Sequence, residues 1–267
     1  MDKEYIQKCP VAFTIRFKKD SRLEAISWYF IFLLIILMPF LSLFPAPGMA
    51  QNIARIAIDP GHGGEDKGCV GLHGTMEKDV TLQLSKRFSE ILHERLGIEA
   101  FLTRREDYYV DLTERTGKAN NSMADLFIGI HANSTFSPGQ TGQIMIFVTS
   151  ATEEGHSGEQ RAIQWDVVQN RFYNESFRLG SLVAEEARNS GLWREALVKE
   201  APILVLKGAS MPAIEVEVDF LTSSQGEERL KDEWYQERIC EVMYRAIVRF
   251  GFIMEEDRNE DPNERHW

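Results

Sequence analysis

Short apolar runs alternate with longer amphipathic runs from residue 51 onward, and this alternation limits the fold more than any other feature of the sequence. Residues 53–59 (IARIAID) are apolar and β-branched and stop at Pro60-Gly61, which indicates a buried strand that ends in a turn. The next run stops at Gly97 and repeats its apolar residues at the spacing of an amphipathic helix: Val80, Leu84, Phe88, Ile91, Leu92 and Leu96.

The same alternation continues along the chain. Further strands are predicted over 98–103, 125–131, 142–149, 203–207 and 213–220, and further helices over about 111–123, 161–189 and 225–250. The last helix would place these residues on its core face: Leu230, Trp234, Ile239, Val242, Met243, Ile247 and Phe250. Strands that alternate with helices predict an α/β fold, namely a single doubly wound domain with a mostly parallel twisted sheet and helices on both faces. We expect this domain over residues 51–254 and a charged tail over 255–267.

The N-terminal part of the chain carries an export signal. Seventeen residues without a charge, 28–44 (WYFIFLLIILMPFLSLF), follow a basic stretch. Their number lies between the about 7–15 residues of a signal-peptide core and the about 20 of a spanning helix. Residues 1–50 are therefore predicted to be a signal peptide or an N-terminal membrane anchor. The small residues Gly48 and Ala50, at positions −3 and −1 of a cut after Ala50, favour cleavage there. We expect everything beyond to be exported to the periplasm or cell envelope, with membrane contact only through residues 26–44 if they are retained.

Charge and cysteine content exclude several classes of protein. The formal net charge is −11, and the segment beyond residue 50 is more acidic still, which excludes nucleic acid as a partner because such binding depends on Lys and Arg. The three cysteines form no CxxC pair, which excludes a thiolate zinc finger or a disulfide framework. Cys69 and Cys240 could pair after export, but we expect both to be unpaired. A metal site in this chain must therefore use histidine and carboxylate ligands.

Histidines stand at the ends of two predicted strands. His62 follows the strand over 53–59, and His131 ends the strand over 125–131. Open α/β sheets build their sites at the carboxyl ends of the strands, so the two imidazoles can converge there. Glu77, at the start of the first helix, supplies a carboxylate near the loop that begins at His62. Two imidazoles and one carboxylate, with a fourth position left to water, form the ligand set of a catalytic zinc site.

Other interpretations of these residues stay open. A histidine at a strand end is commonly a hydrogen-bonded structural residue, and His73 is an alternative ligand or a partner of one. The glycine-rich turn around His62 also suggests a dinucleotide-binding fingerprint. Asp66 stands where the third glycine would fall, which argues against that motif.

The predicted strand over 213–220 (AIEVEVDF) carries a file of carboxylates. Period-two alternation puts Glu215, Glu217 and Asp219 on one face and apolar residues on the other. Carboxylates inside a central strand are costly unless they face a cation, hydrogen-bond partners or water. One of them is a candidate base that activates a water held by the metal, and a solvated edge strand is the alternative. The spacing does not choose between Glu215 and Glu217.

Together these segments resemble the catalytic domain of the zinc-dependent N-acetylmuramoyl-L-alanine amidases of the third amidase class. The matching stretches follow the family order: IAIDPGHGGEDKGCVG, GTMEKDVTLQLSKRF, FLTRREDYYVDLTERTGKAN, ADLFIGIHAN and SMPAIEVEVDFLTSSQGEERL. The resemblance implies that His62, Glu77 and His131 bind Zn²⁺ and that Glu217 is the catalytic carboxylate. The family usually has an aliphatic residue at the position of Glu215 and a glycine at that of Asp219, so the surroundings of Glu217 are expected to be unusually acidic.

The resemblance also implies a function. The substrate would be peptidoglycan, and the bond cut would be the amide between the lactyl group of N-acetylmuramic acid and L-alanine of the stem peptide, with zinc-bound water activated by Glu217. Arg104, Arg115 and Asn120 fall in the matching motifs and read either as substrate contacts or as structural residues. Asn133, two residues beyond His131, is expected to support that ligand.

Regulation and two alternative functions remain open from the sequence. Related amidases can carry an inhibitory segment where residues 150–178 stand here, so weak gating by this segment and a protein activator as partner are hypotheses. The first alternative function is a zinc peptidase that cuts within the stem peptide. The second is a wall-binding module without activity, which the presence of all three ligands and Glu217 disfavours.

Overall fold

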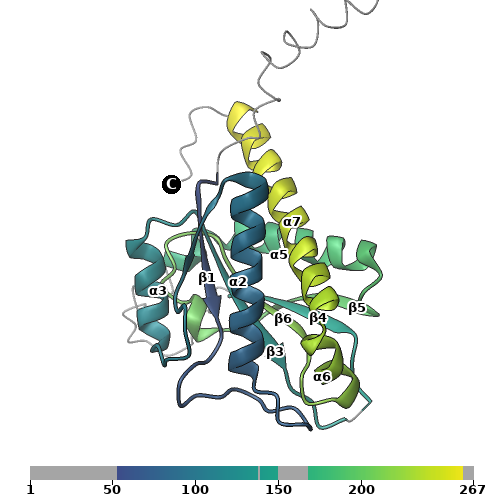
Figure 1. Cartoon of the computed structure of the whole chain (residues 1–267). Coiled ribbons are helices and arrows are strands. Elements are labelled where there is room, and N and C mark those ends of the chain that lie inside the picture. The colour runs from purple at the N-terminus through teal and green to yellow at the C-terminus, as the bar shows by residue number, and fades with distance from the viewer. Residues whose placement is uncertain (1–52, 138, 150–167, 261–267) are drawn as a thin grey trace, which may run out of the picture. The chain divides into compact units, whose positions relative to one another are not determined.

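A six-stranded sheet with the strand order β2-β1-β3-β6-β4-β5 forms the centre of the computed structural model (Figure 1). The structure describes residues 53–137, 139–149 and 168–260. The predicted signal peptide or anchor (1–50), the part of the proposed gating segment over 150–167 and the tail residues 261–267 lie outside the described residues. Within the described part of the chain, no helix combines the length and the apolar character needed to cross a bilayer.

The direction of the strands matches the predicted mostly parallel sheet. The strands are β1 (Arg55–Pro60), β2 (Glu99–Leu102), β3 (Leu126–Asn133), β4 (Gln143–Val148), β5 (Glu195–Glu200) and β6 (Ala213–Phe220). Strands β2, β1, β3 and β6 pair in parallel. Strand β4 is antiparallel to β6 and parallel to β5, so the β4–β5 pair runs against the rest of the sheet. The predicted α/β class is confirmed.

Helices cover both faces of the sheet, as the alternation predicts. The helices are α2 (Glu77–Leu96), α3 (Leu112–Asn121), α5 (Tyr173–Ser190), α6 (Ser224–Lys231) and α7 (Glu233–Glu260), with a 3-10 turn η1 (Leu204–Leu206). The helices α2, α5 and α7 share the larger apolar core with alternate residues of the strands, such as Ile56 and Ile214. The opposite face carries a smaller core, in which Ala57, Phe127 and Ala213 of the strands pack with residues of α3 and η1.

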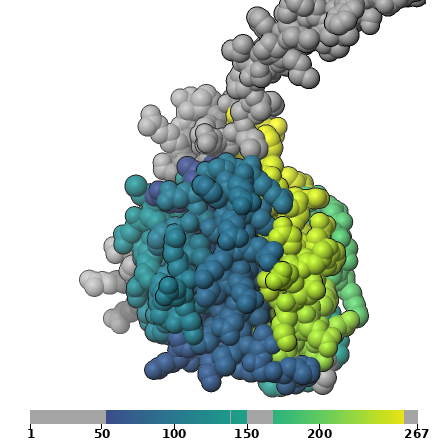
Figure 2. Space-filling view, in the orientation of Figure 1, coloured from purple at the N-terminus to yellow at the C-terminus, as the bar shows by residue number. Residues whose placement is uncertain are grey.

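The two longest helices of this layer lie side by side. Helices α2 and α7 contact each other, and the space-filling view shows their surfaces meeting along one face of the molecule (Figure 2). Helix α2 ends at Gly97, which has a left-handed backbone and donates its N–H to the carbonyls of His93 and Leu92. Helix α2 therefore ends at Gly97, as predicted. Its first residue, Glu77, lies at the edge of the sheet that the carboxyl ends of the parallel strands form.

The predicted strand over 203–207 is wrong. The fifth strand lies earlier, at Glu195–Glu200, and Leu204–Leu206 form η1. Strand β5 pairs only with β4 at the edge of the sheet and therefore tolerates charged residues, which hid it in the sequence. The apolar run contains Val205 and Leu206, which are buried in the smaller core. Their apolar character signals burial rather than a strand.

The single helix predicted over 225–250 is two helices. Asp232 ends α6 with an extended backbone (φ −75°, ψ 122°), and its side chain accepts the N–H of Tyr235 at the start of α7. The break changes the helical phase, so Tyr235 is buried while Trp234, predicted on the core face, is 65% exposed. Helix α7 also continues through residues 255–260, which the sequence analysis assigns to the charged tail.

Candidate metal centre

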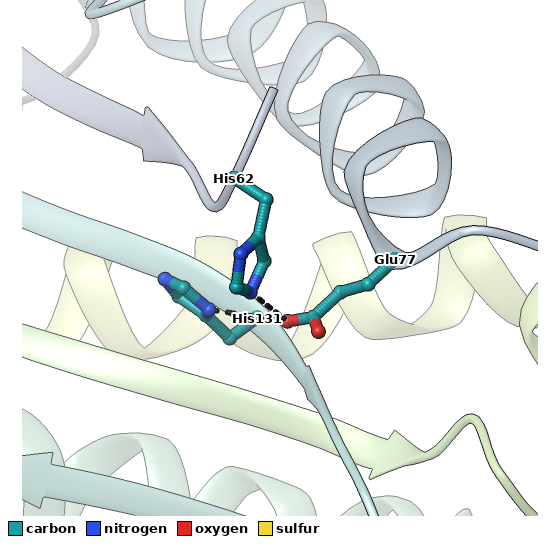
Figure 3. Close-up of side chains that lie close together, drawn as sticks. All are labelled: His62, Glu77 and His131. Atoms are coloured by element: carbon teal, nitrogen blue, oxygen red, sulfur yellow. Dashed lines mark hydrogen bonds and ion pairs between the residues drawn. The ribbon is translucent and has the colours of Figure 1, made fainter. Parts of the chain in front are cut away.

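Three side chains meet where β1, β3 and α2 come together. His62 follows β1, His131 lies near the carboxyl end of β3, and Glu77 is the first residue of α2. Strands β1 and β3 are parallel neighbours with Pro60 opposite Ile130, so their carboxyl ends share one edge of the sheet. Figure 3 shows the three side chains pointing toward one another from these separate elements. The structure thus brings together the three residues that the sequence predicts as metal ligands.

The distances within this trio are short. The Oε1 atom of Glu77 lies 3.1 Å from Nε2 of His62 and 3.1 Å from Nδ1 of His131. One potential ligand atom from each residue lies within 4.8 Å of the others, and within the described ranges no other group of three or more such residues meets this criterion. The imidazole rings stand edge to face, 5.1 Å apart at an angle of 74°.

The residues present fit a zinc ion. Two imidazole nitrogens and one carboxylate oxygen are the donors of catalytic zinc sites. Two glycines leave room for them: a Cβ on Gly61 would lie 2.4 Å from the His131 ring, and a Cβ on Gly68 would lie 2.5 Å from Oε2 of Glu77. A larger residue at position 61 or 68 would therefore displace the side chain of His131 or Glu77.

Neighbouring groups hold the trio in place. The Nδ1 atom of His62 lies 2.8 Å from Oδ2 of Asp66, and the backbone N–H groups of Cys69 and Ala132 donate to the Glu77 carboxylate at 2.8 and 3.1 Å. The sequence analysis did not assign Asp66 or Cys69 to the site. The position of Asp66 four residues after His62, inside a glycine-rich turn, is the signal that could have found it.

The electrostatics of the trio favour the charged form of the carboxylate. Burial alone would raise the pKa of Glu77, but hydrogen bonds from His131 and His62 hold it well below its usual range. Burial opposes the charged form of His131, yet the negative charges of Glu215 and Glu77 raise its pKa to about 10 in the metal-free chain. A cation is therefore favoured at this position.

Two buried arginines fix the loop that carries His62. Arg104 donates to the carbonyls of Pro60 and Gly61 at 3.0 and 2.7 Å. Arg115 donates to the carbonyls of Pro60 and His62, each at 2.7 Å. The two side chains are 0% and 2% exposed, so both serve as structural residues rather than substrate contacts.

Three other predicted residues lie away from the trio. Asn120 cross-links a loop, because its side chain bonds the carbonyl of Gly208 and the N–H of Ser210 at 2.9 and 3.0 Å. The oxygen of Asn133 accepts the N–H of Ser134, and no recorded contact joins its described side chain to His131. His73 is not in the cluster, since its Nδ1 atom lies 3.0 Å from the buried carboxylate of Glu227.

The two cysteines within the described residues are unpaired, as expected. Cys69 and Cys240 are free thiols, the first half-buried and the second fully buried. The Sγ atom of Cys69 lies 3.4 Å from the carbonyl of Ala132. Burial raises the pKa of both thiols, so they are unreactive at neutral pH.

The carboxylates of β6 alternate with apolar residues as predicted. Ile214, Val216 and Val218 pack in the larger core, which directs Glu215 and Glu217 to the other face. The solvated edge-strand alternative is excluded, because β6 pairs with β3 on one side and with β4 on the other.

Glu217 lies directly opposite His131 in the β3–β6 pair. Burial, with repulsion from Glu215 and Glu77, raises the pKa of Glu217 to about 7, although His131 works against the rise. Its Oε2 atom is buried and has no hydrogen-bond partner in the described part of the chain. An unpartnered buried carboxylate oxygen next to a potential ligand is suited to accept a proton from a substrate or a water.

Comparison with known proteins gives a consistent result. A family model described as N-acetylmuramoyl-L-alanine amidase matches residues 56–249. The chain is 30% identical to the N-acetylmuramoyl-L-alanine amidase AmiC of Escherichia coli over 227 residues, which covers 76% of this chain and 54% of AmiC. It thus spans about half the length of that curated relative.

Two solved structures have a similar fold. The amidase AmiC2 of Nostoc punctiforme superposes with a TM-score of 0.58 at 30% identity, covering 73% of this chain and 96% of that chain. The CwlD amidase of Clostridioides difficile, solved in complex with the GerS lipoprotein, superposes with a TM-score of 0.60 at 25% identity. That match covers 75% of this chain and 99% of the CwlD chain.

Proposed function

Because the chain belongs to the N-acetylmuramoyl-L-alanine amidase family, we propose that it hydrolyses peptidoglycan at the amide bond between the lactyl group of N-acetylmuramic acid and L-alanine of the stem peptide. The observation that carries this proposal is the meeting of His62, Glu77 and His131 beside a buried carboxylate with an unpartnered oxygen. The family match covers all of these residues.

We assign the metal to zinc and its ligands to His62, Glu77 and His131. The donor set and the space that Gly61 and Gly68 leave around it support this assignment. When bound, zinc supplies a Lewis acid that polarises the scissile carbonyl and makes a coordinated water acidic near neutral pH. Asp66 would hold the His62 ring through Nδ1, which leaves Nε2 directed at the metal position.

Glu217 is the proposed general base. Its carboxylate would take a proton from the attacking water and return that proton to the departing amine of L-alanine. A base with a pKa near the working pH can do both, and burial raises the pKa of Glu217 to about 7. The register of β6 against β3 keeps this carboxylate beside His131 throughout.

The proposal includes the location of the enzyme. Peptidoglycan lies outside the cytoplasmic membrane, so the predicted signal peptide or anchor at residues 1–50 suits an enzyme of the periplasm or cell envelope. The structure of CwlD with the GerS lipoprotein supports the further proposal that this chain binds a protein partner. N-terminal sequencing of the protein from its host envelope decides between cleavage after Ala50 and a retained anchor.

Mass spectrometry of the products tests the function. Residues 51–267 are incubated with purified peptidoglycan and with soluble muropeptides, before and after chelation and zinc restoration. An amidase releases stem peptides with a free L-alanine amino group, loses this activity on chelation and regains it with zinc. Peptides that leave L-alanine on the sugar would identify the zinc peptidase instead. If the protein binds zinc but releases no product from either substrate, the wall-binding module without activity would be favoured.

A further inference from the structure

The second carboxylate of β6, Glu215, has a different environment from Glu217. It is only 8% exposed and lies opposite Gly129 of β3. Asp59 of β1 stands on the far side of Gly129 in the same row and pairs with Arg115 at 3.0 Å. Glu215 is therefore a carboxylate in the middle of the sheet, two residues before the proposed base.

A buried carboxylate at this position needs a partner, because desolvation of a charge costs several kcal/mol if nothing compensates it. Glu215 forms an ion pair with His131, whose Nε2 atom lies 3.7 Å from Oε2 of Glu215. This distance is that of an ion pair rather than of a direct hydrogen bond. Burial raises the pKa of Glu215, and the charge of His131 lowers it.

The third carboxylate, Asp219, has several hydrogen-bond partners outside the metal centre, as a structural residue does. It accepts the N–H of Gly142 at 2.8 Å and the hydroxyl of Tyr235 at 3.0 Å, and it lies 3.3 Å from Nη1 of Arg229. These partners belong to β4 and to the α6–α7 region rather than to the metal centre. Glu215 has no comparable set among the recorded contacts of the described residues, and its recorded ion pair leads to a proposed ligand.

The two nitrogens of His131 face different carboxylates. Nδ1 lies 3.1 Å from Glu77, on the side of the proposed metal, and Nε2 faces Glu215 on the other side. Histidines that bind metals through one nitrogen commonly donate the N–H of the other to a carboxylate, which fixes the tautomer and raises ligand basicity. We infer that Glu215 is a positioning residue of the metal centre, whose negative carboxylate attracts the Nε2–H side of the His131 ring and so keeps Nδ1 directed at the metal.

This inference rests on the proposed function. It gives each of the three carboxylates of β6 a different role. Glu217 handles the proton of the reaction, Glu215 holds a ligand, and Asp219 ties the sheet to α6 and α7. It also accounts for a departure from the resembled family, which usually has an aliphatic residue at the position of Glu215. In this chain the role of that position would shift from packing to support of the zinc ligand.

Zinc affinity tests the inference without any use of catalysis. The dissociation constant of the exported chain for Zn²⁺ is measured by competition with a chromophoric chelator in the wild type, E215L, E215Q and D219N. We expect E215L to bind zinc about 10–100-fold more weakly, the usual effect of losing the partner of a ligating histidine. E215Q keeps an oxygen acceptor without the charge and should lie between E215L and the wild type. D219N, which removes a charge from the same strand, should keep the wild-type affinity.

The absorption spectrum of the Co²⁺-substituted protein gives a second readout. The d–d bands should shift in E215L and E215Q and stay unchanged in D219N, because only the first two alter the ligand field of His131. Wild-type affinity and spectrum in both Glu215 variants would overturn the inference. An equal loss of affinity in D219N would overturn it too, since the effect would then be general to β6. If E215L does not fold, the nearly isosteric E215Q carries the test.

The result is separable from that of the proposed function. A wild type that binds zinc and releases stem peptides, beside Glu215 variants with unchanged zinc affinity, would refute the positioning role alone. A wild type that binds no zinc would refute the proposed metal centre and the role of Glu215 together.

Discussion

His131 and Glu217 face each other across the β3–β6 pair, so a proposed metal ligand and the proposed base are held at a fixed separation by the hydrogen bonds of the sheet. The register shifts just beyond this pair, between His131 and Asn133. The two side chains therefore belong to the last regular pair before the register shift, beyond which pairing resumes at Asn133 and Phe220. Their relation depends on backbone pairing and not on loop conformation, which suits a site that must keep its geometry through a reaction.

Replacement of Glu217 by Gln should abolish amide hydrolysis and spare metal binding. The amide keeps the size of the carboxylate but cannot accept the proton, and loss of a general base typically costs about 10²–10⁴-fold in rate. Turnover of a soluble muropeptide and zinc content after gel filtration measure the two effects. Wild-type turnover in this variant would assign the base elsewhere, with Glu215 as the first residue to examine.

Replacement of Gly61 by Ala should weaken zinc binding. The new Cβ would lie 2.4 Å from the His131 ring, so the ring must move out of the site. Gly117 in α3 has nothing within 4 Å of its added Cβ and is the matched control. Gly117→Ala should keep zinc and raise the free energy of unfolding by about 0.5–1 kcal/mol. Equal zinc affinity in both variants would show that the close approach of Gly61 does not shape the site.

Replacement of Arg115 by Met should destabilise the fold by about 3–5 kcal/mol, because it leaves the buried carboxylate of Asp59 without its ionic partner. Urea denaturation of the metal-free protein measures this loss. Arg245 pairs with Glu241 on the exposed surface of α7 and provides the control. Arg245→Met should change the free energy of unfolding by less than about 1 kcal/mol. A small effect at Arg115 would mean that its ion pair with Asp59 does not stabilise the fold.

Glu227 should contribute a pH-dependent part of the stability. Burial alone would raise its pKa, but hydrogen bonds from Thr75 and His73 lower it to about 2. The pKa of Glu227 is thus lower in the folded chain than in the unfolded chain, where it is about 4.3. The stabilisation is fully present above the unfolded pKa and is lost as the pH falls toward 2.

Unfolding free energies of the wild type and Glu227→Gln between pH 6 and pH 2 measure this contribution. The difference between the two proteins should be largest above pH 5 and shrink steadily below pH 4. Glu228→Gln, at the exposed neighbouring position, is the control and should change the free energy of unfolding by less than about 0.5 kcal/mol. A pH-independent difference for Glu227→Gln would show that the charge of Glu227 does not stabilise the loop over residues 71–75.

Local patterns in the sequence were enough to predict the ligands' convergence. The strand before His62 and the strand that ends in His131 are parallel neighbours, and their carboxyl ends meet, as the alternation of strands and helices implies. The stop of α2 at Gly97 and the alternation in β6 follow from equally local signals. These features depend on periodicity and on single turn residues, which the sequence displays directly.

Features that depend on three-dimensional packing were not predictable in the same way. The buried positions of Arg104 and Arg115 follow from the fold. Arg104 follows β2 and Arg115 lies in α3, and each guanidinium reaches its carbonyl acceptors only after β2 or α3 has packed beside β1. Strand β5 was missed because an edge strand needs no apolar run, and η1 was misassigned because burial alone does not distinguish a 3-10 turn from a strand. The spacing in β6 did not choose between Glu215 and Glu217; the family resemblance implied Glu217, and the position of Glu217 opposite His131 supports that proposal.

Arg104 and Arg115 bond main-chain carbonyls of the loop that carries His62, and this affects how the loop can evolve. Every amino acid supplies the same carbonyl, so Arg104 and Arg115 hold the loop through atoms that substitution leaves in place. The exposed residues Glu65 and Lys67 beyond His62 are therefore free to change sign or size without displacing the imidazole. The charge on this loop can therefore change during evolution or by design while the positions of His62, Glu77 and His131 are kept.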